Sequence, residues 1–134
     1  MGTVVVGYVP KPEGEAALNS GIAEAKLRSA RIVVVNSHRG GSEFDAEASV
    51  KAEADMERIK GMLTDAGLDH EVRQLVRGFE PAEDLIGIAE DAEAELIVIG
   101  LRRRSPVGKL ILGSNAQRIL LDAKCPVLAV KADA

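Results

Sequence analysis

The chain has 134 residues, of which 46% are hydrophobic and 28% charged, a composition typical of one globular domain and not of a disordered or fibrous chain. Its formal net charge of −4 argues against nucleic acid and anionic membrane surfaces as partners. One cysteine excludes an intrachain disulfide framework and a cysteine-rich metal site, and the lack of a signal peptide pattern or a membrane-spanning apolar run predicts a cytoplasmic protein.

The first half of the chain predicts two strands, each followed by a helix. Residues 3–6 and 32–35 are continuous β-branched runs, which is typical of strands covered on both faces. Apolar residues recur at helical spacing over 17–25 and again over 59–66, so each stripe suits a helix packed on a sheet. The polar segment 37–47 predicts a long loop before the second helix.

The second half continues the alternation of strands and helices. Residues 70–76 alternate polar with apolar side chains, which suits a strand at the sheet edge with one wetter face. Residues 96–99 and 127–130 are again continuously apolar, and helical stripes occupy 82–89 and 116–123. Because few aromatic residues are present, we expect a core of valine, isoleucine, leucine and alanine.

Strands that alternate with helices imply right-handed crossovers and a parallel sheet. We therefore predict a single α/β domain over residues 1–134, with a doubly wound, Rossmann-like five-stranded parallel sheet and helices on both faces. The residues expected in its core are Val4, Val6, Val33, Val35, Ile97, Ile99 and Leu128.

Two loops are candidates for binding a ligand, because open parallel sheets bind ligands beyond the carboxyl ends of their strands. Residues 7–14 follow the first strand, and residues 100–115 follow the fourth. In the second loop, Gly113 and Ser114 open the last helix, whose free amides and positive dipole end suit a phosphate. The same loop contains three consecutive arginines, 102–104. These features also fit a plain turn, an ordinary helix start and a solvated surface, and both interpretations stay open.

The motifs of the chain, taken in sequence order, resemble those of the universal stress protein family. Gly100 followed by Gly113-Ser114 is similar to the family signature G-x-x-G-x9-G-[S/T]. Further landmarks that look like the family's, in chain order, are Val4-Val5-Val6-Gly7, Glu15-Ala16-Ala17-Leu18, Gly78-x-x-Pro81-Ala82 and Cys125-Pro126-Val127-Leu128-Ala129-Val130. The resemblance covers essentially the whole chain. It implies a strand order 3-2-1-4-5 and a crevice between the first and fourth strands, where one branch of the family binds ATP.

Two residues depart from the family's ATP-binding pattern. Arg103 stands where the signature has its second glycine, and Val9 stands where the ATP-binding branch usually carries an aspartate. An arginine-rich loop could bind phosphate through side-chain charge where the usual motif uses backbone amides. Alternatively, Arg103 could fill the pocket.

The resemblance implies a stress-response signalling module that is not an enzyme. It would bind ATP or another adenine nucleotide, with or without Mg, and act through an unidentified signalling partner. The candidate nucleotide-binding residues are Tyr8, Val9, Pro10, Ser37, Ile99, Gly100, Arg102, Arg103, Gly113, Ser114 and Asn115. One alternative is a dimeric interaction module whose degenerate loop binds no nucleotide. Another is a slow phosphohydrolase, although the sequence offers no evident water-positioning residue.

The last strand also predicts a partner. An apolar strand at a sheet edge leaves backbone groups unpaired, and such an edge tends to pair with another copy. We therefore expect a homodimer joined through Val127, Leu128, Ala129 and Val130, as the resemblance also implies.

Overall fold

The computed structural model of the chain describes residues 2–39, 46–77, 81–101 and 113–132. Strands and helices alternate throughout. In chain order they are β1 (Thr3–Gly7), α1 (Pro12–Arg28), β2 (Arg31–Arg39), α2 (Ala46–Asp65), β3 (His70–Arg77), α3 (Pro81–Asp91), β4 (Leu96–Leu101), α4 (Ser114–Asp122) and β5 (Val127–Lys131). The strands form one five-stranded sheet in the order β3-β2-β1-β4-β5, and all neighbours run parallel. The predicted fold class and strand order are confirmed.

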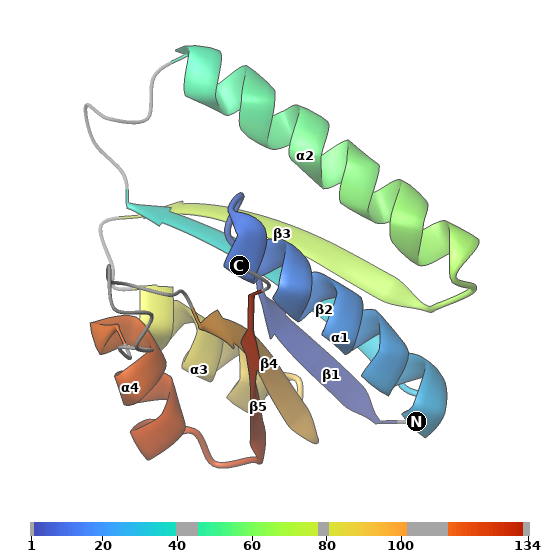
Figure 1. The fold of residues 1–134 in the computed structure, drawn as a ribbon, viewed down its shortest axis with the longest axis vertical. Helices are drawn as coiled ribbons and strands as arrows, with labels where there is room; N and C mark the ends of the chain where they lie inside the picture. The colour runs from blue at the N-terminus through green and yellow to red at the C-terminus, as the bar shows by residue number, and fades with distance from the viewer. Residues whose placement is uncertain (1, 40–45, 78–80, 102–112, 133–134) are drawn as a thin grey trace.

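The sheet is covered on both faces, as Figure 1 shows. Val4 and Val6 of β1 pack under α1 and α2, in a cluster with Leu18 and Ile59. Val5 points to the opposite face and packs under α3 and α4. Since successive strand side chains point to opposite faces, a continuous apolar run is what a strand between two helical layers requires.

Six of the seven predicted core residues are buried, and Leu128 is the exception. Leu128 is only partly buried and packs against the cluster under α1. The whole apolar part of β5 is half-buried in the same way. The reason is topological: β5 is an edge strand and pairs only with β4 in the part of the chain that the structure describes.

The predicted loop after the second strand begins too early. Ser37 was assigned to that loop, but β2 continues to Arg39. The added residues pair with the long edge strand β3, with Ser37 opposite Leu75 and Arg39 opposite Arg77. A polar sequence therefore remains a strand because its neighbour supplies backbone partners. Within the described ranges, no helix is long and apolar enough to cross a membrane.

Candidate functional site

The chain changes direction across the sheet at the boundary between β1 and β4. From β1 it crosses through α1 to β2, and from β4 it crosses through α4 to β5, on the other side. Connections that leave two adjacent parallel strands in opposite directions open a crevice at their carboxyl ends. A cavity of about 130 Å³ lies there, between the ends of these strands and the first turns of α3 and α4. The predicted residues that line it are Tyr8, Val9, Ile99, Gly100 and Asn115.

The first turn of α4 borders this cavity through Asn115 and Ala116. Gly113 precedes the helix in an extended conformation, and no side chain of the described residues is hydrogen-bonded there as a cap. Ser114 is the first helical residue and is exposed, so Gly113 and not Ser114 occupies the cap position. The first turn contains no acidic residue. The positive end of the helix dipole and its first amides are therefore not compensated by the helix's own side chains.

The two glycines of the signature have different surroundings. A Cβ atom on Gly113 would meet no atom of the described residues within 4 Å. A Cβ atom on Gly100 would lie 2.0 Å from the carbonyl oxygen of Glu13 in α1. Gly100 therefore makes room for the backbone of α1 while it lines the cavity.

Tyr8 follows β1, and its ring lies under α1 and α2 with Val4 and Val6, away from the cluster that faces α3 and α4. Its hydroxyl donates a hydrogen bond to Glu15 Oε1 at 2.9 Å and accepts one from Arg58 Nη2 at 3.1 Å. Burial raises the pKa of the Tyr8 phenol well above its usual range, and the hydrogen bond to Glu15 raises it further. The hydroxyl is thus a neutral group that is already engaged by protein.

The cavity walls are apolar beyond the predicted residues. Gly7 belongs to the predicted loop 7–14, whereas sequence reasoning missed Val35, Leu85 and Ile119 of β2, α3 and α4. Two patterns could have found them. The alternating side-chain direction in the strands points Val35 toward the α3–α4 layer, and the apolar stripes of α3 and α4 point Leu85 and Ile119 toward the sheet. None of the described lining residues is charged.

The comparison with known proteins identifies the family. The sequence model of the universal stress protein family matches residues 1–131. The chain belongs to the universal stress protein family. A universal stress protein of Mycolicibacterium smegmatis is 44% identical to it over 128 residues, which cover 96% of each chain.

Solved universal stress proteins also share the fold. One from Archaeoglobus fulgidus is 36% identical, with a TM-score of 0.83 over 98% of this chain and 99% of its own. Another structure of a universal stress protein from A. fulgidus, solved in complex with dAMP, is 30% identical, with a TM-score of 0.76 over 98% of each chain. The expected family membership is therefore confirmed along the chain's length.

The other predicted site residues of this universal stress protein are placed as follows. Pro10 is exposed in the segment between β1 and α1. Ser37 lies in β2, on the other side of β1 from β4, and the structure does not describe its side chain. Arg102 and Arg103 lie outside the described residues. Among the residues that are described, no group of three His, Cys, Asp or Glu side chains could hold a metal ion.

Proposed function

We propose that this universal stress protein binds an adenine nucleotide at the crevice between β1 and β4, with the phosphates at the first turn of α4. The observation that carries the proposal is the uncapped, acid-free start of α4 beside the open space at Gly113. Free backbone amides at the positive end of a helix dipole attract anions. ATP is the nucleotide that we expect first, with or without Mg.

The cavity suits the base or the ribose and not the whole nucleotide. Its volume of about 130 Å³ is below the range of roughly 300–1,000 Å³ that is usual for small-molecule sites. Val35, Leu85 and Ile99 offer apolar surface for a flat ring. The phosphates then lie outside the cavity, where Ser114 and Asn115 are exposed. The dAMP complex of the A. fulgidus relative supports an adenine nucleotide as the ligand class.

Calorimetric titration with ATP, AMP and dAMP tests this proposal, with Gly113→Val as the decisive variant. A branched side chain at Gly113 fills the space that the phosphates need, so binding should be lost. Gly87→Val is a matched control, because a Cβ atom on Gly87 in α3 also meets nothing within 4 Å. If the unsubstituted protein binds none of the three nucleotides at millimolar concentration, the proposal fails and the nucleotide-free interaction module replaces it.

We propose further that the protein signals by binding and not by catalysis. In this view the nucleotide changes the contacts that the protein makes with a signalling partner in a stress response. Slow phosphohydrolysis is the competing function. Chromatography of ATP after prolonged incubation separates the two: product that accumulates beyond one equivalent, and is lost with Gly113→Val, supports a phosphohydrolase.

We also propose a homodimer through the edge of β5. Val127, Leu128, Ala129 and Val130 are half-buried in one chain and so offer apolar surface beside unpaired backbone groups. The opposite edge, β3, carries an ion pair between Arg73 and Glu71, which discourages such pairing. Val130→Glu should therefore give a monomer in size-exclusion chromatography with light scattering. An unsubstituted protein that is already monomeric at micromolar concentration contradicts the dimer.

A further inference from the structure

The chain between β1 and α1 borders the crevice through Tyr8 and Val9. The segment 9–14, which leads into the first turn of α1, is held at both ends by side chains. Tyr8 stands before the segment and Glu15 stands after it, in the first turn of α1. The hydroxyl of Tyr8 donates to Glu15 Oε1 at 2.9 Å, which closes residues 9–14 into a ring. Val9, inside this ring, lines the cavity opposite Gly100 of β4.

Backbone contacts fix the shape of the same segment. The amide of Lys11 donates to the carbonyl of Val9 at 2.8 Å, and the amides of Gly14 and Glu15 donate to the carbonyl of Lys11 at 2.9 and 3.0 Å. A Cβ atom on Gly14 would lie 1.7 Å from the Val9 carbonyl oxygen, so the segment folds directly onto the helix. A small movement of Tyr8 or Glu15 would therefore displace the wall.

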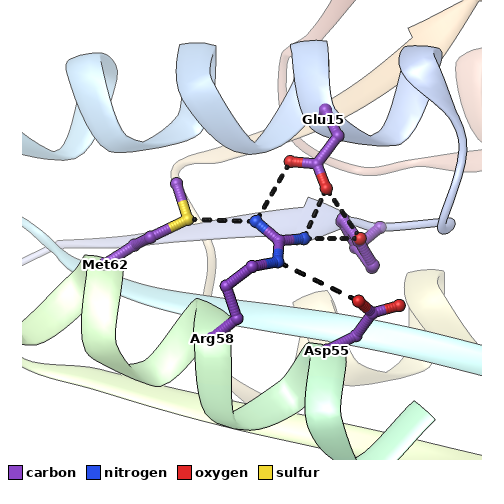
Figure 2. Close-up of polar contacts among 5 residues, drawn as sticks. Glu15, Asp55, Arg58 and Met62 are labelled. Carbon is purple, nitrogen blue, oxygen red and sulfur yellow. Dashed lines mark hydrogen bonds and ion pairs between the residues drawn. The ribbon is translucent and has the colours of Figure 1, made fainter. Parts of the chain in front are cut away.

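Arg58 attaches this ring to α2, a helix that otherwise lies apart from the crevice (Figure 1). Its Nη2 donates to the Tyr8 hydroxyl at 3.1 Å and also to Glu15 Oε1 (Figure 2). On its own helix it contacts Asp55 Oδ1 at 3.9 Å and donates to Met62 Sδ at 3.4 Å. The Arg58 guanidinium thus has partners on both α1 and α2. Its positive charge compensates the Glu15 carboxylate beside the buried Tyr8 phenol.

We propose that Tyr8, Glu15 and Arg58 are positioning residues that hold residues 9–14 in the shape of the crevice wall and thereby set its affinity for an adenine nucleotide. This inference rests on the proposed nucleotide binding and names the residues that control it. None of the three groups needs to touch the ligand. The network faces α1 and α2, whereas the other cavity walls belong to the face under α3 and α4.

The experiment compares three variants of the network with one control. Tyr8→Phe removes only the hydroxyl, and Arg58→Met removes the guanidinium group. Arg58→Lys keeps the positive charge without the planar guanidinium. Arg28→Met is the control, because Arg28 also joins α1 to another segment, through Glu24 and Glu95. All four are titrated with ATP and dAMP, and amide hydrogen exchange is followed in the proteins without ligand.

We expect Tyr8→Phe and Arg58→Met to weaken nucleotide binding about fivefold or more, the effect of one lost hydrogen bond. Arg58→Lys should recover part of the loss, and Arg28→Met should bind as the unsubstituted protein does. Exchange at the amides of Lys11, Gly14 and Glu15 should accelerate in Tyr8→Phe and not in Arg28→Met. A loss of thermal stability with unchanged affinity would show that the network only stabilises the fold, and would overturn the inference.

The two proposals fail in different ways. If the unsubstituted protein binds no nucleotide, the proposed function is wrong, and the role in affinity is lost with it. If it binds nucleotide but Tyr8→Phe changes neither the affinity nor the exchange at Lys11, Gly14 and Glu15, the function stands and the positioning role is wrong.

Discussion

Two helices, α1 and α4, begin at the carboxyl ends of the adjacent strands β1 and β4, yet their first turns are built differently. α1 begins with Pro12 and has Glu13 and Glu15 in its first turn, so its own carboxylates compensate the positive end of its dipole. α4 begins after Gly113, with no acidic residue in its first turn and no capping side chain from the part of the chain that the structure describes. The first turn of α1 is thus compensated by its own side chains, whereas that of α4 is not, as the proposed phosphate site requires.

The glycines beside the two helices show the same contrast. Gly100 and Gly14 are needed because backbone atoms of other residues lie where their side chains would be, at 2.0 and 1.7 Å. Gly113 has a φ of −71° and open space around it, so neither strain nor packing requires glycine there.

The largest expected effect is on packing at α1. Gly100→Ala should lower the free energy of unfolding by about 3 kcal/mol or more, because the new methyl group must push the Glu13 carbonyl away from β4. Gly113→Ala, at an open position, should change it by less than about 0.5 kcal/mol. Urea denaturation of the two variants measures the difference. Equal stabilities would contradict the proposed roles of both glycines.

The next effect concerns charge at the start of α4. Ser114→Asp places a carboxylate in its first turn and so makes α4 resemble α1. Thermal stability should stay the same or rise slightly, since an acid near a helix start contributes about 0.3–1 kcal/mol. Nucleotide affinity should fall at least about tenfold, because like charges are brought together. Ser114→Asn separates charge from size, and it should retain most of the binding. Unchanged affinity in Ser114→Asp would place the phosphates elsewhere.

A third effect concerns the ionisation of Tyr8, which contacts α1, and the loss of stability that this causes at high pH. The folded protein holds the Tyr8 proton more tightly than the unfolded chain does, because burial and Glu15 raise the phenol pKa. Stability from this group is therefore complete below the unfolded pKa of about 10 and is lost as the pH rises above it. Tyr8 is the only tyrosine, and the chain has no tryptophan, so the tyrosinate absorbance reports this one group.

In an alkaline titration, the Tyr8 absorbance should rise only above the pH at which free tyrosine ionises. Glu15→Gln should shift the rise to lower pH, because it removes the carboxylate that opposes ionisation. Glu24→Gln, at the other end of α1, is the control and should leave the curve in place. A Tyr8 curve that matches free tyrosine in the folded protein would mean that the phenol is not buried as described.

The smallest expected effect is that of Ser114→Ala. Loss of one hydroxyl from the start of α4 should weaken nucleotide binding by about 1 kcal/mol and leave the unfolding temperature almost unchanged. The comparison with Ser114→Asp then separates a lost hydrogen bond from an added charge. A clear loss of stability in Ser114→Ala would show that the hydroxyl is part of the fold.

The residue at position 9 can be used to test which nucleotide the crevice prefers. Val9 is partly exposed at the cavity, where the ATP-binding branch of the family usually carries an aspartate. Val9→Asp should favour AMP over dAMP, because a carboxylate can accept a hydrogen bond from a ribose hydroxyl. Competition between the two nucleotides measures the preference, which should be small in the unsubstituted protein.

Much of the fold follows from patterns that lie within a few residues of one another. The continuous apolar runs of β1, β2 and β4 require cover on both faces, and helical stripes between them provide it. The alternating polarity of β3 agrees with its place at the sheet edge, where one face of a strand is wetter. Gly67, with a φ of +72°, follows the end of α2 in the left-handed conformation that glycine adopts easily.

Within the site, the sequence determined which loops meet, because parallel strands bring their carboxyl ends to one edge. It also determined that Gly113 and Ser114 stand at the start of α4. It could not determine the reason for Gly100 or the direction of Tyr8, since these depend on residues far away in the chain. Arg58 reaches Tyr8 across 50 positions, and α1 contacts β4 because the sheet order places that strand beside β1. Local patterns specify strands, helices and their faces, but only the assembled sheet decides which backbone and which side chain occupy the space between them.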